Sequence, residues 1–342
     1  MKAFNVVEPG AYTTVQDRGR YGFQQFGVPP CGSLDSFAAD MANLLVGNLK
    51  NEALLEFTFS GGLLEVLCPG DIAIAGADME ATINDRPVDN WCSCPVLPGD
   101  RIRLNQVKTG CRAYLAVTGG IDVPLVMGSR SCYTGAKFGG FEGRPLAAGD
   151  LLDRGGGTPL ARPRALPGEY IPRYGSDIVL RAIPGPQDDF FDQGMETFFT
   201  SRFTVSNRAN RMGYRLQGDP VRQKPGMPKS IISEPSLPGG VQIPEDGQPI
   251  ILLAEQTVGG YTKIATVISA DIPKIAQAKP GERIAFQRVS LDQAHAAYRK
   301  RRRFFETLHT MDLEVKKSDT MGEGFFSSDL FKQRIQDYLL QA

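Results

Sequence analysis

Short apolar runs separated by turn residues fill the first half of the chain. Between residues 54 and 103 these runs are LLEFTF, LLEVL, IAIAG, MEATIN and RIRL, and the pairs Gly61-Gly62, Pro69-Gly70 and Pro98-Gly99 stand between them. Strands that recur about every ten residues are typical of an antiparallel sandwich or barrel rather than of a parallel α/β sheet. The pattern therefore predicts a mainly β fold.

Apolar residues recur at helical spacing in two other places. Ser33 or Asp35 precedes the first of them as an N-cap, and Gly47 follows it as a stop. The second is a stripe of Met and Phe, which is more typical of a core than of a cofactor site. The two sets are Phe37, Met41, Leu44 and Leu45, and Phe191, Met195, Phe198 and Phe199. We expect both helices to bury these faces.

The stretch from Pro244 to Ser269 is predicted to be a strand, a loop and a second strand. Apolar residues fill 250–254, β-branched residues recur in 264–268, and Gly259-Gly260 separates the two runs. The two glycines let a ligand approach the backbone, which favours a cradle for a small polar ligand. A twisted β-connection with polar groups facing water explains the same stretch equally well. The polar residues of the loop are Glu255, Gln256, Thr257, Tyr261 and Lys263.

A second candidate site lies in the loop that follows the opening strand Phe4 to Val7. Gln16, Asp17, Arg18 and Arg20 stand there between glycines and ahead of a proline pair. This is loop composition with many hydrogen-bonding groups. The alternative is a structural clamp in which Asp17 pairs with Arg20.

Two weaker signals for anion binding occur elsewhere. The glycine-rich segment 119–140 holds Ser129, Arg130, Ser131 and Tyr133, but no clear helix follows it. In NRANRMGYRLQG, Arg208, Arg211 and Arg215 surround Tyr214, and arginine forks suit carboxylate or phosphate. A solvated, salt-bridged turn explains the second segment at least as well.

Length and composition indicate two domains. The chain has 342 residues with 38 glycines and 24 prolines, and these two residues make up about 12 per cent of an average protein. Residues 154–175 are rich in both and lack apolar periodicity, which is typical of a domain boundary. We predict a first domain over 1–160, a linker over 161–176, a second domain over 177–290 and a helical C-terminal extension over 291–342. PGDRIRL at 98–104 recurs as PGERIAF at 280–286, which indicates that the two halves share a β-fold.

Charge and residue counts exclude several classes of function. Lys and Arg number 38 and so do Asp and Glu, so neither nucleic acid nor a membrane surface is an expected partner. No apolar run approaches the ~20 residues that span a bilayer, and we expect a cytoplasmic protein. Only two histidines occur, which argues against a Ser-His-Asp triad and a histidine metal site, and no metal ligands are predicted. The six cysteines form no CxxC pair and are expected to be buried free thiols.

The tail from His295 onward differs from the rest of the chain. The basic run Arg299 to Arg303 is interpreted as a solvated helix face. Behind Ser328, the spacing of Leu330, Phe331, Ile335 and Leu339 predicts an amphipathic helix that docks on its own domain or on a partner.

Several long motifs together resemble the biotin-dependent carboxyltransferase, or allophanate hydrolase subunit 2, family. In the first half they are YTTVQDRGRYG, LDSFAADMANLLVGN, LEFTFSGG, YLAVTGGIDVP, GSRS and FGGFEGRPLAAGD. In the second half they are LRAIPGPQ, NRMGYRLQG, GGVQIPEDGQPIILLAEQTVGGYTKIATVISADI and AQAKPGE. They run in order from about Phe4 to Phe286. The chain departs from the family's usual Asp and Thr at Glu255 and Val258.

The resemblance implies a fold, partners and a cofactor. The fold is two tandem cyclophilin-like β-barrel domains with a few helices. The family includes KipA-like proteins and a subunit of ATP-dependent 5-oxoprolinase, which opens 5-oxoproline to glutamate with KipI-like (PxpB) and LamB/YcsF-like (PxpA) subunits. ATP, with Mg, is then expected on this chain or at a subunit interface, although no GxxxxGK[ST] motif occurs. No biotinylation motif occurs either, so no covalently attached biotin is expected on this chain.

The resemblance also selects site residues. The expected catalytic residues are Asp17, Arg20, Arg211, Asp246 and Lys263. The residues expected to bind substrate or cofactor are Arg130, Tyr214, Arg215, Gln242, Gln248, Gln256, Thr257, Gly259, Gly260 and Tyr261. Replacing Arg211 or Lys263 by alanine is expected to abolish activity and leave folding intact.

Three functions fit these expectations. The favoured one is a subunit of an ATP-dependent 5-oxoprolinase, a hydrolase of a cyclic amide. The second is a biotin-dependent carboxyltransferase that acts on urea or a related amide. The third is a non-catalytic, KipA-like regulator that binds a kinase inhibitor.

Overall fold

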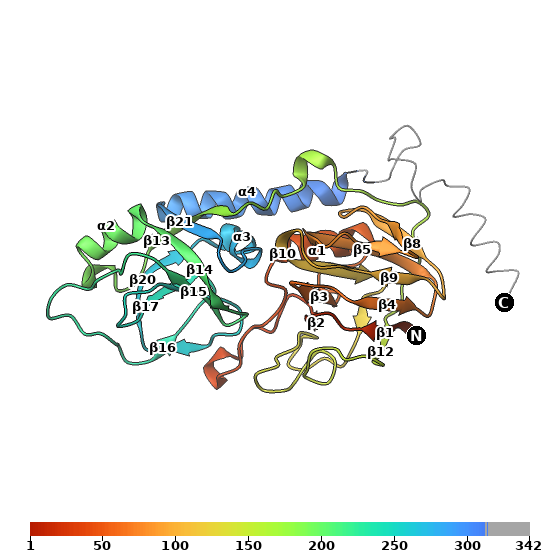
Figure 1. The fold of residues 1–342 in the computed structure, drawn as a ribbon, viewed down its shortest axis with the longest axis horizontal. Coiled ribbons are helices and arrows are strands. Elements are labelled where there is room, and N and C mark those ends of the chain that lie inside the picture. The colour runs from red at the N-terminus through yellow and green to blue at the C-terminus, as the bar shows by residue number, and fades with distance from the viewer. Residues whose placement is uncertain (312, 314–342) are drawn as a thin grey trace, which may run out of the picture. The chain divides into compact units, whose positions relative to one another are not determined.

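The computed structural model describes residues 1–311 and 313, and the chain divides into two compact units (Figure 1). The first unit contains Met1–Gly19, Ser36–Arg173 and the described residues from Met311 on. The second contains Arg20–Asp35 and Tyr174–Thr310. The amphipathic helix predicted behind Ser328 lies outside the described residues.

Residues 20–35 belong to the second unit, although the sequence pattern places them in the first domain. The Cys31 N–H donates to the Ala254 carbonyl at 2.9 Å, and Leu34 is buried in the core of the second unit. The Gln277 amide donates to Asp35 at 2.8 Å. A loop without apolar periodicity does not indicate which core it packs on. The sequence pattern therefore could not assign residues 20–35 to the second unit.

The predicted linker is also divided between the units, since the first unit runs to Arg173. Ala165 forms a β-bridge with Cys92, and the Leu166 N–H donates to the Trp91 carbonyl at 2.9 Å. These backbone bonds attach a proline-rich segment to the first unit.

Two antiparallel sheets and a helix make up the first unit. The seven-stranded sheet has the order β11 (Ile121–Asp122), β12 (Leu151–Arg154), β1 (Lys2–Glu8), β4 (Leu63–Val66), β9 (Arg101–Arg103), β6 (Thr82–Ile83), β7 (Arg86–Pro87). The five-stranded sheet has the order β2 (Tyr12–Gln16), β3 (Leu54–Thr58), β10 (Thr109–Val117), β5 (Gly70–Asp78), β8 (Ser93–Val96). Helix α1 (Ser36–Leu45), predicted from its apolar spacing, lies against β10 and β5 (Figure 1).

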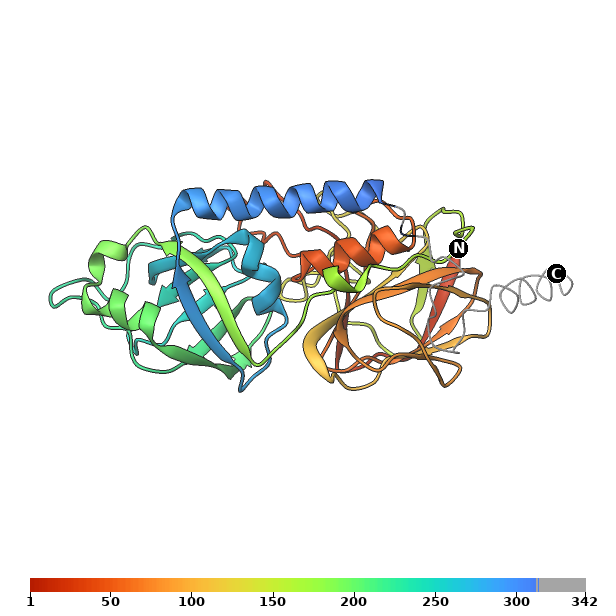
Figure 2. The same cartoon turned by 90° about the horizontal axis from the view of Figure 1, so that it is seen from above.

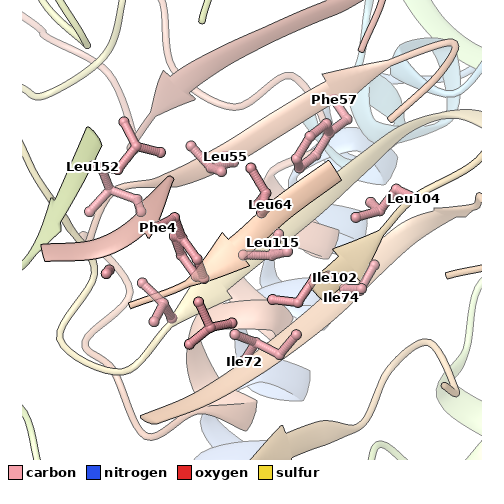
Figure 3. Close-up of a cluster of buried hydrophobic side chains, with 14 of the residues drawn as sticks. Phe4, Leu55, Phe57, Leu64, Ile72, Ile74, Ile102, Leu104, Leu115 and Leu152 are labelled. Carbon is pink, nitrogen blue, oxygen red and sulfur yellow. The ribbon is translucent and has the colours of Figure 1, made fainter. Parts of the chain in front are cut away.

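The core of the first unit is formed between its two sheets. Side chains at alternate positions of a strand point to one face, so each sheet contributes one apolar face. Figure 3 shows Phe4, Leu64 and Ile102 of one sheet pointing toward Leu55 and Leu115 of the other. All six cysteines are buried free thiols, as predicted.

The second unit is a closed seven-stranded barrel. Its order is β13 (Asp177–Pro184), β20 (Thr262–Val267), β17 (Gly240–Ile243), β18 (Ile250–Leu252), β15 (Gly213–Gln217), β14 (Arg202–Ala209), β21 (Arg283–Arg288). Neighbouring strands are antiparallel, except that β21 closes the barrel parallel to β13. A separate two-stranded ladder pairs β16 (Glu234–Pro235) with β19 (Val258–Gly259). The mainly β fold with a barrel is thus confirmed.

Three helices and four short 3-10 turns complete the described elements. Helix α2 (Gln193–Thr200) carries Met195, Phe198 and Phe199 of the predicted stripe, whereas Phe191 precedes the helix. Phe198 is fully buried and stacked on Phe286 at 4.2 Å between ring centroids. Helix α3 (Ile272–Ala276) packs against β13, and the long helix α4 (Leu291–Thr310), drawn blue in Figure 2, contacts β13 and η4. None of the helices in residues 1–311 is long and apolar enough to cross a membrane. The 3-10 turns are η1 (Gln24–Phe26), η2 (Gly168–Tyr170), η3 (Asp188–Phe190) and η4 (Ser269–Asp271).

Candidate functional site

The stretch 244–269 forms the predicted strand, loop and strand, as β18, β19 and β20. In the barrel, β20 also pairs with β17, where Gln242 stands directly opposite Lys263. The register shifts between Val241 and Gln242, so a β-bulge lies beside this pair. Side chains that face each other across two strands lie about 5 Å apart at their Cβ atoms and on the same face. The sheet therefore places a lysine and an amide side by side.

Lys263 is a nearly buried cation with a carboxylate partner on the β16–β19 ladder. Its side chain is 7% exposed, and its ammonium donates to Glu234 Oε1 at 2.5 Å. Gln187, just after β13, donates from its amide to the same oxygen at 3.2 Å and accepts from the Lys263 N–H at 2.9 Å. The hydrogen bond from Lys263 lowers the pKa of Glu234, burial opposes this, and the Gln187 amide adds to the lowering. Glu234 therefore carries its negative charge at neutral pH.

Gln242 presents a donor that has no acceptor. It is 4% exposed, and its Nε2 atom is buried without a hydrogen-bond partner. A Cβ atom on Gly259 would lie 2.1 Å from that nitrogen, so β19 passes directly over the amide. Buried donors are normally paired, and one that is not is a candidate for ligand binding. We call Gln187, Glu234, Gln242, Gly259 and Lys263 the Lys263 cluster.

Arg211, an expected catalytic residue, and Glu255 of the 244–269 loop form a second buried pair. The Arg211 Nε donates to Glu255 Oε1 at 2.5 Å, and its Nη2 donates to the Gly32 carbonyl at 2.7 Å. The exposed fractions of the two side chains are 5% and 8%. This pair fastens the segment 20–35, which includes the expected site residue Arg20, to the barrel loop.

Asp17 lies in the first unit, and protein donors surround its carboxylate. It accepts hydrogen bonds from the hydroxyls of Ser129 and Ser131 at 2.6 and 2.5 Å and from the N–H groups of Arg130 and Gly19 at 2.6 and 2.7 Å. Asp17 thus joins the two polar loops of this unit that the sequence marked separately. The Arg130 guanidinium points elsewhere and donates to the Val123 carbonyl at 3.1 Å.

Other expected residues have local structural contacts. Tyr214 is buried in the barrel core and donates to the Ala278 carbonyl at 3.2 Å, whereas its neighbour Arg215 is exposed. Asp246 is exposed and accepts from the Gln248 N–H at 2.9 Å, and the Gln248 amide bonds both backbone groups of Gly218.

The remaining loop residues lie along the β16–β19 ladder. The Gln256 amide donates to the Val258 carbonyl, the Thr257 carbonyl accepts from the Ser236 N–H and the Gly260 carbonyl accepts from the Ile231 N–H, both at 2.8 Å. Tyr261 is 42% exposed beside them.

Sequence reasoning missed Gln187 and Glu234. Glu234 stands in the proline-rich segment 220–239, which has no periodicity, and Gln187 stands in LRAIPGPQ, a motif that contributes only to the family resemblance. A polar residue inside such a motif was the available signal. Among residues 1–311 and 313, no group of three or more His, Cys, Asp or Glu side chains is arranged to hold a metal ion.

The chain thus combines a first unit of two antiparallel sheets with a second unit that is a seven-stranded barrel, and the barrel carries a buried lysine and amide. Residues 26–288 match the family described as carboxyltransferase domain, subdomain A and B. The chain belongs to this family, as the sequence motifs predicted.

Curated relatives specify the family further. The chain is 40% identical to the 5-oxoprolinase C subunit of Escherichia coli (strain K12), over 89% of this chain and 96% of that protein. It is 34% identical to the protein of the same name from Haemophilus influenzae, over 86% of this chain and 94% of that protein. The crystal structure of K. lactis urea amidolyase superposes with a TM-score of 0.85 at 30% identity, covering 93% of this chain and 21% of that one. The proteins to which this chain is similar are thus enzymes or enzyme subunits.

Proposed function

We propose that this chain is the C subunit of a cytoplasmic, ATP-dependent 5-oxoprolinase that opens 5-oxoproline to glutamate. The observation that carries this proposal is the degree of similarity, since the chain is 40% identical to the E. coli 5-oxoprolinase C subunit over 89% of its residues but 30% identical to K. lactis urea amidolyase. The name of the E. coli protein is that of one subunit in a multi-subunit enzyme, and the partners we propose are KipI-like and LamB/YcsF-like subunits.

The Lys263 cluster supports a role in holding the organic substrate. A lactam is an unactivated amide, and its opening is favoured by donors aimed at its oxygen, where charge develops. Phosphorylation of that oxygen would make it a leaving group, which explains why such a reaction uses ATP. Gln242 offers a buried N–H donor and Lys263 a buried cation.

ATP does not fit the Lys263 cluster itself. The cluster carries one ammonium and one carboxylate, so its net charge is zero and it cannot neutralise a triphosphate. A triphosphate is usually bound by several cations or backbone N–H groups. We therefore assign these residues to the organic substrate and derive no step for ATP from them. ATP and Mg remain proposals for the assembled enzyme.

Turnover by the assembled enzyme tests the proposal. The chain is co-expressed with the KipI-like and LamB/YcsF-like subunits, the complex is purified, and ATP-dependent release of glutamate from 5-oxoproline is measured. Lys263→Met should reduce turnover about 100-fold, because a buried donor to the substrate is lost. Glu234, left behind, can turn to water because it is 39% exposed, so the variant should fold.

Lys224→Met is the matched control, since Lys224 pairs with Asp192 at 2.9 Å in the same unit and lies outside the cluster. It should keep wild-type turnover. A verified complex of all subunits that releases no glutamate would contradict the proposed function.

The likeness to urea amidolyase supports a second candidate, a biotin-dependent carboxyltransferase acting on urea or a related amide. In that case the same chain would transfer carboxylate from a carboxybiotin carrier protein to urea. Adding such a carrier and urea to the purified chain, and measuring loss of carboxybiotin, distinguishes the two functions.

A further inference from the structure

We propose that Lys263 and Gln242 bind a small molecule with a carboxylate beside an amide carbonyl, and that Glu234 holds the place of that carboxylate until the ligand displaces it. The β16–β19 ladder is then the movable cover of the site. The choice of 5-oxoproline as the main probe rests on the proposed function, but the ligand class rests on the structure.

The two members of the Lys263–Glu234 pair differ in how well water reaches them. The Lys263 side chain is 7% exposed and that of Glu234 is 39% exposed. An ammonium that is nearly buried needs an anion, because an unpaired buried charge is strongly destabilising. Glu234 has no such need, since its carboxylate can be hydrated by a small side-chain rotation. The position next to Lys263 therefore requires a carboxylate, but not this particular one.

Gln242 adds the second requirement. An unmatched buried amide donor is destabilising, and an acceptor oxygen on a ligand would remove that cost. Because Gln242 and Lys263 are cross-strand partners, their two donor groups lie on one face of the barrel. A ligand that places a carboxylate and a neighbouring carbonyl oxygen against this face meets both donors. A simple carboxylate meets only one of them.

The cover is held mainly by backbone hydrogen bonds. Two residue pairs join β16 to β19, and bonds from Ile231 to Gly260 and from Ser236 to Thr257 flank them. Apolar side chains along the ladder point to solvent, with exposed fractions of 93% for Ile232, 65% for Leu237 and 49% for Val258. Segments with little apolar burial open at low cost.

A further buried group lies at the end of the ladder, directly after β16. The Ser236 hydroxyl has no hydrogen-bond partner, although the Ser236 N–H is bonded to the Thr257 carbonyl. Two such groups, the Ser236 hydroxyl and the Gln242 amide, lie on segments that flank β19. With the ladder in place and no ligand bound, these two polar groups have no hydrogen-bond partner. This is expected of a site in which a ligand supplies the missing partners.

The first experiment measures binding by calorimetry with the full chain. The probes are 5-oxoproline, N-acetylglycine as an open-chain amide with a carboxylate, and 2-pyrrolidinone as the lactam without a carboxylate. Both carboxylates should bind, and 2-pyrrolidinone should bind about 100-fold more weakly because it leaves Lys263 on Glu234.

Glu234→Gln gives the decisive result, because it removes a competing carboxylate. It should tighten binding of 5-oxoproline about tenfold, equivalent to ~1.4 kcal/mol. Asp192→Asn, which removes the carboxylate paired with Lys224, should leave binding unchanged. Weaker or unchanged binding by the Glu234→Gln variant would overturn the proposal.

Gly259→Ala tests the part played by Gln242. The three atoms nearest to the added Cβ all belong to the Gln242 amide, so the substitution displaces that amide and should weaken binding about tenfold. Gly175→Ala, in the same unit with no atom within 4 Å of an added Cβ, should bind as wild type. Equal affinities for the Gly259 and Gly175 variants would contradict a role of the amide.

These outcomes separate this inference from the proposed function. If N-acetylglycine binds and Glu234→Gln tightens it, but 5-oxoproline neither binds nor is turned over, the carboxylate exchange stands and the proposed function fails. If the complex turns over 5-oxoproline while the full chain and its Glu234→Gln variant bind none of the carboxylates, the function stands and the inference fails.

Discussion

At the scale of the residue, Arg211 and Lys263 show how two buried cations in one barrel can have different tasks. Arg211 and Glu255 are both buried, and Arg211 also bonds the Gly32 carbonyl. Water cannot replace either partner, because the other would then be a buried charge that has lost its opposite charge. Lys263 instead pairs with Glu234, which reaches solvent. The Arg211–Glu255 pair is suited to hold the chain together. In the Lys263–Glu234 pair, a ligand carboxylate can take the place of Glu234.

Arg211→Ala should therefore destabilise the second unit, by about 3–5 kcal/mol, since it leaves Glu255 buried without its cation. This replaces the expectation from the sequence that the variant folds normally. Urea denaturation followed by fluorescence measures the loss. Arg208→Ala, on an exposed position of β14, should cost less than about 0.5 kcal/mol, and equal losses in the two variants would remove the structural role of Arg211.

At the scale of the element, apolar spacing predicted α1, the Phe stripe of α2 and the strands around the 244–269 loop. It could do so because each of these elements buries a face whose period is visible within ten residues. The cover over the Lys263 cluster was not predictable in this way. Strands β16 and β19 are two residues long and pair through backbone groups more than twenty residues apart, and no side-chain period accompanies such a pairing.

The candidate site was predicted in part for the same reason. Lys263, Gln242 and Gly259 were identified from one stretch and its family motif, whereas the partner Glu234 comes from an aperiodic segment. Asp17 and the serines that it binds were each identified in the sequence. They are more than 110 residues apart, so the sequence did not indicate that they form one hydrogen-bonded cluster.

The repeated PG turn is an element that both units share. In the first unit the Gly99 N–H donates to Val66, the Val66 N–H donates to Asp100, and the Asp100 carboxylate accepts from the Leu97 N–H. In the second unit Gly281, Val205, Glu282 and Lys279 make the same set of bonds. The echo seen in the sequence is thus a repeated turn that leads into a strand (β9 or β21) and bonds a neighbouring strand (β4 or β14).

Matched glycine variants should show that the two turns are energetically equivalent. Gly99 and Gly281 have φ of +88° and +89°, and an added Cβ at either would meet no atom within 4 Å. Alanine at each position therefore adds backbone strain alone, of about 1–2 kcal/mol. Chemical denaturation of Gly99→Ala and Gly281→Ala should give equal losses, and a loss more than about twice as large in one turn would contradict the equivalence.

At the scale of the whole molecule, the described residues form two hydrophobic cores, one for each unit. Apart from residues 20–35, whose one apolar contribution is Leu34 in the second core, each core is built from its own run of strands. The family match covers 26–288, which contains all of the second core and all of the first except Ala3, Phe4, Val6 and Val15. Units with separate cores unfold as separate cooperative transitions unless a large apolar interface couples them.

Calorimetric melting of the full chain should accordingly resolve two transitions, and single core variants should assign them. Leu115 of β10 and Leu216 of β15 are both fully buried, each in a different core. Replacing either by alanine removes the same side chain and costs about 2–5 kcal/mol in the core that loses it. Leu115→Ala should lower the midpoint of one transition only, and Leu216→Ala that of the other. If either variant shifts both midpoints by the same amount, the two units fold as one, and residues 20–35 then become the first segment to test as the coupling element.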